Sequence, residues 1–366
     1  MNENLWKVPL ILNKNRIKRA YVGGKLLDQW QGIEPATDGQ FPEEFIVSTI
    51  EVSNADRFPG EGLSKLTLEN GREVTLRDLI KEDPTAYLGE PYANLMDGLL
   101  GVLARVGDTI VRHVIQVHPN KEIANMYLKF PNGKDEAWYI IATREIDGQT
   151  PYAYAGFRKG INRDNWQELF VKQDIQGMLA ALNKLENLKE GDILMIPAGL
   201  PHAIGPGALF LEVHEPCDYT FRLEREYLTG RTFSDEEIHY GIGLNAFFDA
   251  FNYATYSLEE IKSKIIKTPK LIRQTEFGSE YELIAYADTP NFAVNKIKTY
   301  GEYPVLPFEG HRLAIITKGF GTMIYHGGEK SVRQGQGVFL PAGLRDLKLF
   351  SDSDMEVVLA YPPKIN

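Results

Sequence analysis

Four side chains of the types that bind metal ions occur in three short segments of the chain. Gln116 and His118 lie two positions apart in "VIQVHPN", and two such residues on a strand point to one face of a sheet. Glu136 opens the apolar run "EAWYII", and His202 follows a Pro/Gly-rich turn in "IPAGLPHAI". Two imidazoles, a carboxylate and an amide suit a borderline divalent ion. The four residues therefore predict a metal site.

The same residues also have a purely structural interpretation, which the spacing leaves open. His118 can cap the turn before Pro119, and Glu136 can form an ordinary ion pair with Lys134. A further histidine, His113, is expected on the opposite face of the strand from His118. It is therefore not counted among the ligands.

The elements that must position these residues are mostly strands. Short apolar runs separated by Gly, Pro, Asn and Asp fill much of the chain, which is typical of a β-sandwich or barrel. Helical periodicity is confined to about 79–87, to a stretch that starts at Arg163, and to 234–267. Two capping-box patterns predict two helices in the last stretch: Ser234 with Glu237, and Ser257 with Glu260.

One strand and turn occurs twice in the sequence. "GDILMIPAGLPHAI" starts at Gly191 and returns as "GQGVFLPAGLRDLK" from Gly335. Similarity over such a long separation indicates two copies of a domain rather than a solenoid. In the second copy Asp346 stands where the first has His202. The histidine is therefore not needed for the turn, which favours its reading as an added ligand.

The motifs together resemble the type I mannose-6-phosphate isomerases, a family of two-cupin sugar isomerases. The resemblance is carried by "IQVHP", "KDEAWYII", "GDILMIPAGLPHAIGPG" and "LEVHEPCDYTFRL", and more loosely by "YVGGKLLDQW", "PEEFIVS" and "FLPAGLRDLKL". It covers most of the chain, and the set of motifs is specific although no single member is.

The resemblance implies both a site and a chemistry. It implies zinc as the cofactor, one ion per chain, with other divalent metals possible, and its ligands would be Gln116, His118, Glu136 and His202. It also implies three catalytic residues: Arg222, Glu212 and Lys134. The expected reaction interconverts mannose 6-phosphate and fructose 6-phosphate, or a related sugar, through a negatively charged enediolate. Such an intermediate needs cationic groups and a base beside it.

The expected fold is mainly β, with two cupin (jelly-roll β-sandwich) domains. We expect an N-terminal catalytic cupin over residues 1–233 with a helical insertion at about 161–188, and a helical connector over 234–267. A C-terminal cupin without a metal site would occupy 268–366.

Two positions depart from the family near the place where its phosphate binds. Val114 replaces a small hydroxyl residue, and Arg105 replaces a lysine. Valine donates no hydrogen bond, whereas arginine binds phosphate at least as well as lysine does. We therefore predict Arg105 as a substrate-binding residue, and an altered recognition of the sugar.

Composition limits the partners of the chain. Fifty acidic residues against 40 basic ones, in 366, give a formal net charge of -10, which argues against nucleic acid or anionic lipid as the main partner. A single cysteine and a start, "MNENLWKVPL", unlike a signal peptide predict a cytoplasmic protein without disulfides. The expected partner is a small sugar or sugar phosphate.

Two other functional classes stay open from the sequence. A sugar- or metal-binding regulatory cupin with little turnover would fit the altered phosphate region. An oxygen-using iron enzyme would fit the metal ligands but would leave Lys134, Glu212 and Arg222 without a role. The physiological sugar, the native metal and the oligomeric state are also open at this point.

Overall fold

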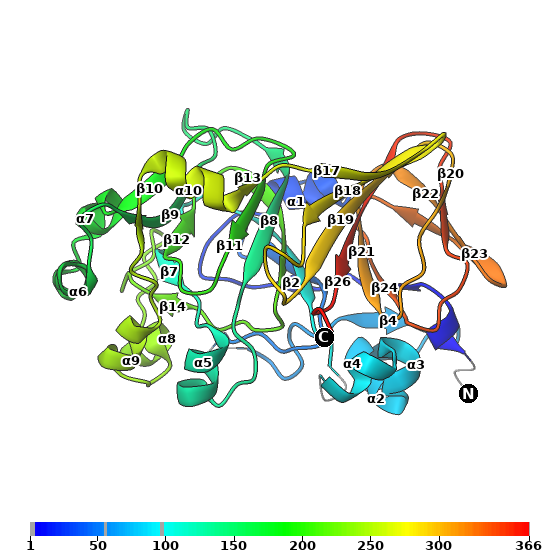
Figure 1. Cartoon of the computed structure of the whole chain (residues 1–366), viewed down its shortest axis with the longest axis horizontal. Helices are drawn as coiled ribbons and strands as arrows, with labels where there is room; N and C mark the ends of the chain where they lie inside the picture. Colours follow the sequence, from blue (N-terminus) through cyan, green and yellow to red (C-terminus); the bar gives the residue numbers. More distant parts are fainter. Residues whose placement is uncertain (1–3, 55–56, 96–98, 366) are drawn as a thin grey trace.

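The structure is a computed structural model that describes residues 4–54, 57–95 and 99–365. Two sheets, antiparallel except for the parallel pair β15–β9, face each other in the first two-thirds of the chain (Figure 1). Sheet I has the order β16 (Ile266–Lys267), β11 (Ile193–Ile196), β8 (Glu136–Thr143), β13 (Ala208–His214), β6 (Leu103–Asp108), β3 (Glu43–Val47), β2 (Arg16–Ile17). Sheet II has the order β10 (Leu182–Leu185), β9 (Ala153–Arg158), β12 (His202–Ile204), β7 (Gln116–Val117), β14 (Phe221–Arg222), with β15 (Thr255–Tyr256) beside β9.

Two further sheets form the other half of the molecule. Sheet III has the order β1 (Leu10–Ile11), β24 (Gly337–Leu340), β21 (Arg312–Lys318), β26 (Met355–Tyr361), β19 (Ala293–Thr299), β18 (Gly278–Ile284), β17 (Lys270–Thr275). Sheet IV has the order β20 (Glu302–Pro304), β25 (Lys348–Phe350), β22 (Phe320–Tyr325), β23 (Gly328–Arg333). A core that includes Ile316, Val357, Met323 and Leu349 fills the space between these two sheets.

Alternation along β8 shows how the halves are joined. Trp138 and Ile140 point into the core between sheets I and II, whereas Tyr139 and Ile141 point to the other face of sheet I. That other face packs directly on sheet III, so one hydrophobic core runs between the two halves. The mainly β fold expected from the sequence is confirmed.

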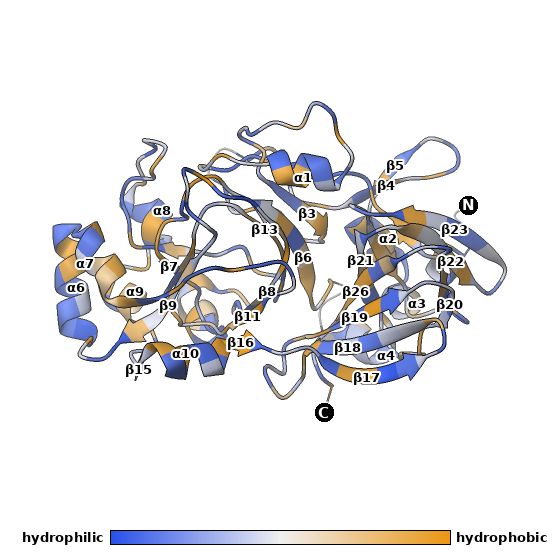
Figure 2. Cartoon of the chain, turned by 90° about the horizontal axis from the view of Figure 1, so that it is seen from above, coloured by the Kyte–Doolittle hydropathy of each residue, from blue (hydrophilic) through white to orange (hydrophobic). Residues whose placement is uncertain are grey.

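The helices lie at the ends and outside of the sheets. The predicted insertion holds α6 (Arg163–Lys172) and α7 (Ile175–Ala180), which carry both hydrophobic and hydrophilic segments in Figure 2. The predicted helix at about 79–87 is two helices, α2 (Leu76–Glu82) and α3 (Pro84–Leu88), because Pro84 starts a new helix. The remaining short elements of this part of the chain are η1 (Leu5–Lys7), α1 (Lys25–Trp30), β4 (Lys65–Thr67), β5 (Glu73–Thr75), α4 (Glu90–Leu95), α5 (Lys121–Ile123) and η2 (Ala124–Leu128).

The predicted connector contains three helices rather than two. Both capping boxes are present, at the starts of α8 (Asp235–His239) and α10 (Leu258–Ile265). Between them lies α9 (Leu244–Asp249), which the sequence analysis missed because Gly243 precedes it without any side-chain cap. None of the helices in the described residues has the length and apolar character needed to cross a membrane.

The proposed domain boundaries remain a prediction. Sheets III and IV are built almost entirely from residues after 268, as a C-terminal unit would require. The exception is β1, which lies in the range assigned to the N-terminal domain but pairs with β24. The start of the chain therefore completes the sheet of the second half.

Candidate active site

The predicted ligands come from the two facing sheets of the first half. His202 opens β12 and pairs with Gln116 on β7, so both belong to sheet II, and His118 follows directly after β7. Glu136 opens β8 in sheet I. The facing arrangement brings the four residues together at one end of the space between the sheets.

The two histidines and the glutamate form a tight, fully buried group. Their ligand atoms lie within 4.8 Å of one another. The Glu136 carboxylate lies 3.1 Å from His118 Nε2 and 3.2 Å from His202 Nε2. Gln116 Nε2 lies 3.1 Å from His202 Nε2, so the amide reaches the same point.

Backbone carbonyls fix the tautomer of both histidines. His118 Nδ1 donates to the Tyr219 carbonyl (3.0 Å), and His202 Nδ1 donates to the Leu200 carbonyl (2.8 Å). A carbonyl only accepts, so each Nδ1 carries the proton and each Nε2 presents a lone pair towards Glu136. Burial, together with the charge of Lys134, lowers the pKa of His118 to about 3, which keeps the ring neutral.

The donor set fits a divalent cation. Glu136 Oε1 is buried without a hydrogen-bond partner, although His202 Nε2 lies 3.2 Å away, because both atoms present lone pairs. An orphaned carboxylate oxygen between two neutral imidazoles is costly unless a cation binds there. The amide of Gln116 can offer its oxygen to the same point. The residues present therefore suit zinc or a related ion.

Lys134 is the cation that now lies against this group. Its Nζ donates to Glu136 Oε2 (2.5 Å) and to Glu212 Oε1 (2.9 Å), and its side chain is completely buried. Burial lowers the pKa of Lys134, but the two carboxylates outweigh this and the pKa lies above its ordinary value. The ion pair with Glu136 that the structural interpretation required is therefore present together with the ligand-like geometry.

Glu212 lies between two cations on sheet I. Its other oxygen, Oε2, accepts from Arg105 Nη2 at 2.7 Å, and Arg105 is its direct partner across the β13–β6 pair. Burial raises the pKa of Glu212, although Arg105 opposes the shift. His214 lies two positions further along β13 and shares the face of Glu212, and its Nε2 lies 3.8 Å from Glu212 Oε1. A buried carboxylate with a raised pKa is suited to accept a proton.

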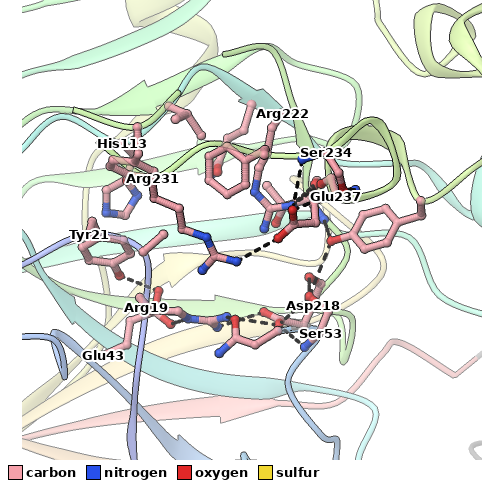
Figure 3. A pocket seen from close by; sticks show the side chains of 18 of the residues that line it. Arg19, Tyr21, Glu43, Ser53, His113, Asp218, Arg222, Arg231, Ser234 and Glu237 are labelled. Atoms are coloured by element: carbon pink, nitrogen blue, oxygen red, sulfur yellow. Dashed lines mark hydrogen bonds and ion pairs between the residues drawn. The ribbon is translucent and has the colours of Figure 1, made fainter. Parts of the chain in front are cut away.

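A cavity of about 520 Å³ opens beside this group (Figure 3). Of the eight predicted site residues, it is lined by Arg105, Gln116 and Arg222, whereas His118, Lys134, Glu136, His202 and Glu212 do not line it and are almost completely buried. The side chain of Arg105 thus lies between Glu212 and the cavity. The volume is large enough for a monosaccharide or its phosphate.

Arg222 reaches the cavity from β14, where it pairs with Gln116. Its Nη1 donates to the carbonyls of Thr220 (3.3 Å) and Glu237 (2.6 Å), and its guanidinium lies 5.1 Å from the centre of the Phe233 ring. The nearby Glu224 forms its ion pair with Arg112 rather than with Arg222. Among the described residues Arg222 has no carboxylate within ion-pair distance, so its charge is available to a ligand.

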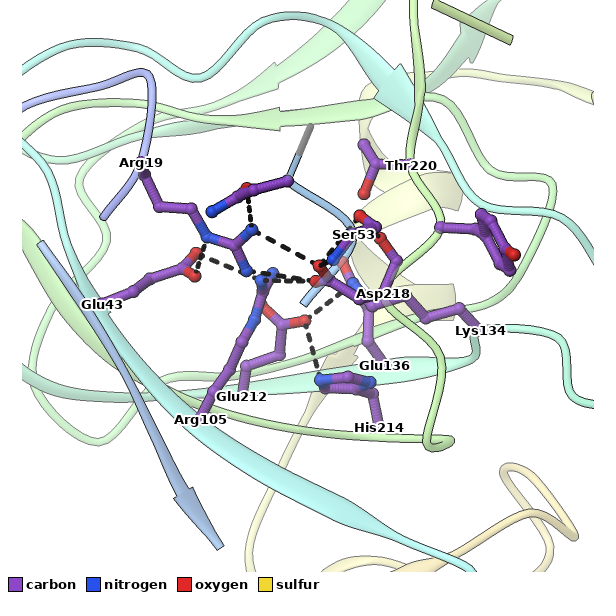
Figure 4. Close-up of polar contacts among 12 residues, drawn as sticks. Arg19, Glu43, Ser53, Arg105, Lys134, Glu136, Glu212, His214, Asp218 and Thr220 are labelled. Carbon is purple, nitrogen blue, oxygen red and sulfur yellow. Dashed lines mark hydrogen bonds and ion pairs between the residues drawn. The ribbon is translucent and has the colours of Figure 1, made fainter. Parts of the chain in front are cut away.

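The sequence analysis missed an ionic network on the cavity wall (Figure 4). Arg19 pairs with Glu43 (2.5 Å) and Asp218 (3.1 Å), and Arg105 pairs with Glu43 as well (3.1 Å). Asp218 also accepts from the backbone and the hydroxyl of Ser53. Glu43 and Asp218 lie within the quoted motifs "PEEFIVS" and "CDYTFRL", but nothing in their spacing connects them to Arg19.

One histidine lies where the sequence did not place it. We expected His113 to point away from the site, by alternation with His118. The structure has no strand over 113–115, since β7 begins at Gln116, so the alternation does not apply. His113 lines the cavity, and its ring lies 4.2 Å from that of Tyr21. Burial lowers its pKa to about 3, so it is a neutral part of the wall.

The two facing sheets and their buried histidine–glutamate group define a cupin-like β protein with a candidate metal site, and comparison with known proteins narrows the class. No protein-family model matches the chain. Mannose-6-phosphate isomerase ManA of Bacillus subtilis is 31% identical over 164 residues, which are 42% of this chain and 48% of that protein. This chain thus spans about half of that relative. The "Probable mannose-6-phosphate isomerase GmuF" of the same organism is 23% identical over 293 residues, or 79% of this chain and 82% of that protein.

Solved structures of such isomerases share the fold along the whole chain. The mannose 6-phosphate isomerase of Bacillus subtilis has a TM-score of 0.74 at 19% identity, covering 97% of this chain and 100% of that one. A variant of phosphomannose isomerase from Salmonella typhimurium has a TM-score of 0.73 at 18% identity, with the same coverage. The resemblance to the type I mannose-6-phosphate isomerases is therefore confirmed.

Proposed function

We propose that the chain is a metal-dependent aldose–ketose isomerase that moves a carbonyl group between C1 and C2 of an open-chain sugar, with mannose 6-phosphate and fructose 6-phosphate as the first pair to test. The class of enzyme is supported by the named relatives. The observation that carries the proposal is the buried His118–Glu136–His202 group beside a cavity lined by Arg222, which has no carboxylate partner among the described residues.

The metal would be held by His118, Glu136 and His202, with the amide of Gln116 as the fourth ligand. A divalent ion bound there supplies a Lewis acid, which makes the proton next to the sugar carbonyl easier to remove.

The other predicted residues have complementary roles in the proposal. Glu212 is the proposed base, which takes the proton from one carbon and returns it to the next, because its buried carboxylate has a raised pKa. The Arg105 side chain lies between Glu212 and the cavity and must move aside for this transfer. Arg222 points its unpaired charge at the cavity and stabilises the enediolate. Lys134 holds Glu136 and Glu212 in place through two hydrogen bonds and balances their charge.

The first test is metal analysis of the wild type and of His202→Ala, together with isomerisation assays. We expect about one metal ion per chain in the wild type, and loss of both metal and turnover in the variant. Full turnover by wild-type protein stripped of metal would contradict the proposal. Metal and sugar binding without conversion of any sugar would instead favour a regulatory binding protein.

A second candidate function is isomerisation of a sugar without phosphate, and the charge of the cavity favours it. Among the described residues, four arginines and four carboxylates line the cavity: Arg19, Arg105, Arg222, Arg231, Glu43, Asp218, Glu236 and Glu237. Three of these arginines are paired with carboxylates, and Val114 contributes an apolar surface. A dianionic phosphate would thus meet one unpaired guanidinium and several carboxylates.

The two candidates are separated by comparing kcat/KM for mannose and for mannose 6-phosphate on the same preparation. A preference for mannose, with weak inhibition by inorganic phosphate, would support the second candidate. A preference for mannose 6-phosphate would show that the paired arginines rearrange around the phosphate.

A further inference from the structure

The turn between β18 and β19, which belongs to the second half of the molecule, reaches the candidate active site of the first half. Thr289 Oγ1 donates to Asp135 Oδ2 at 2.7 Å, and Asn291 Nδ2 donates to the same oxygen at 2.9 Å. Asp135 stands between Lys134 and Glu136 in the chain. Its remaining oxygen, Oδ1, accepts from the backbone N–H of Ala198 (2.8 Å), in the turn that precedes His202.

The Asn291 side chain also contacts two other segments that carry site residues. Its Nδ2 donates to Glu215 Oε2 (3.2 Å), next to His214 at the end of β13. Its Oδ1 accepts from Lys121 Nζ (2.5 Å), which is in α5, three residues after His118. Lys121 and Glu215 also pair with each other, at 3.2 Å.

We propose that Thr289 and Asn291 are positioning residues of the active site, which act through Asp135 and Glu215. Their two side chains join the segments that carry His118, Lys134 with Glu136, His202, and Glu212. Neither residue lines the cavity or touches a predicted ligand. The inference rests on the proposed function, because it assigns to the second half the task of holding the first half's metal ligands and base.

These contacts give the second half of the molecule a role at the site, although its copy of the repeated turn lacks the histidine found at position 202. The position of His202 is taken there by Asp346, which is largely exposed, so this half supplies no matching ligand at that point. It supplies instead a buried hydroxyl, since Thr289 is 2% exposed, and an amide at the junction of four segments. Groups that hydrogen-bond a metal ligand directly typically change metal affinity 10- to 100-fold when removed. Thr289 and Asn291 act one contact further out, through Asp135 and Glu215, so the lower end of this range is expected.

The test compares Thr289→Val and Asn291→Ala with variants that make the same changes elsewhere in the second half. Thr299→Val removes an equally buried hydroxyl that donates to the carbonyls of Phe277 and Gly301. Asn295→Ala removes an amide that donates to Glu280. For each purified full-length protein the affinity for Zn²⁺ is measured by competition with a chromophoric chelator, and kcat and KM are measured on the sugar that the wild type converts.

We expect both test variants to bind Zn²⁺ about tenfold more weakly and to lose about tenfold in kcat, with little change in KM, because the cavity wall stays in place. The controls should keep both values, and Thr289→Ser should recover them because it restores the hydroxyl. Zn²⁺ affinity and kcat within twofold of the controls would overturn the proposal. If the wild type converts no sugar, the proposed function fails, and the Zn²⁺ affinities still decide whether the turn positions the ligands.

Discussion

Arg105 is held at both ends by carboxylates, and this limits what it can contribute. Its Nη2 donates to Glu212 and its Nη1 to Glu43, so both terminal nitrogens are engaged by carboxylates, which would compete with a phosphate. A planar guanidinium can join two carboxylates at a fixed angle, which the point charge of a lysine cannot do. The sequence suggested that Arg105 binds substrate. Its contacts favour the alternative, that it positions Glu212, the proposed base.

Replacement of Arg105 by lysine separates these roles. We expect Arg105→Lys to lose more than tenfold in kcat, because Glu212 is no longer fixed, while KM changes by the same factor for phosphorylated and unphosphorylated sugar. Steady-state kinetics on both sugars checks this. A rise in KM confined to the phosphorylated sugar would restore Arg105 to the role of phosphate ligand.

At the scale of elements, α8 positions Arg222, the cavity arginine for which the described part of the chain offers no carboxylate partner. The carbonyl of Glu237, in this helix, accepts from Arg222 Nη1 at 2.6 Å. The same Glu237 closes the capping box with Ser234, whose side chain accepts from the Glu237 N–H. The N-cap of a five-residue helix thus fixes the orientation of Arg222.

Removal of this cap should therefore affect activity as well as stability. We expect Ser234→Ala to cost about 1 kcal/mol of stability and to lower kcat/KM several-fold, because Glu237 and with it Arg222 move. Ser257→Ala is the matched control, since it removes the cap of α10, which does not line the cavity. Urea unfolding measures the stability of both variants, and steady-state kinetics measures their kcat/KM. Equal losses of kcat/KM in the two variants would mean that α8 acts through stability alone.

The elements also show which features could be predicted from the sequence. The two capping boxes could be predicted from it, because each depends on residues three positions apart and on the period of one helix. The ligand-type residues could be picked out within three short segments, but their meeting at one point depends on two facing sheets, and their role as ligands remains a prediction. The network of Arg19, Glu43 and Asp218 could not, because it joins three segments that meet only after the sheets have formed. The same holds for the contacts of Asn291, which no local pattern marks.

The repeated turn illustrates a partial success. Both copies close with the same hydrogen bond, from Leu200 N to the Pro197 carbonyl and from Leu344 N to the Pro341 carbonyl, each 3.1 Å. The glycines differ, however. Gly199 has a positive φ of 81°, whereas Gly343 has no positive φ, and a Cβ there would meet the Trp6 ring at 2.2 Å. The motif therefore predicted the turn correctly, but different physical needs select glycine in its two copies.

At the scale of the whole molecule, the two halves depend on each other through a shared core. Sheets I and III pack face to face, and buried polar contacts cross the same boundary. Lys296 Nζ of β19 donates to the Tyr139 hydroxyl of β8 (3.1 Å), and Trp30 Nε1 of α1 donates to the Thr317 carbonyl of β21 (2.9 Å). A separated half would expose this core, so we infer that the chain unfolds as one unit.

A buried histidine at this boundary makes the stability of the whole chain depend on pH. His311, before β21, lies completely buried, and its Nδ1 donates to the carbonyl of Leu88 at the end of α3 (3.3 Å). Burial lowers its pKa from 6.5 to about 4. The unfolded chain therefore binds a proton below pH 6.5 that the folded chain does not bind until about pH 4. This contribution to stability is complete above pH 6.5 and is lost as the pH falls towards 4.

The prediction is that His311→Gln loses less stability than the wild type on acidification. Between pH 7 and pH 5 the proton taken up by the unfolded chain should cost the wild type ~2 kcal/mol that the variant does not lose. Urea unfolding of both proteins at the two pH values measures the difference, and His326→Gln, which removes an exposed histidine, is the control. Since the halves unfold together, the loss should appear in the single transition of the whole chain and in the loss of enzyme activity at the same urea concentration. If His311→Gln and the wild type lose equal stability over this range, His311 does not stay neutral in the folded chain. The interface between α3 and the second half would then contain a protonated imidazole.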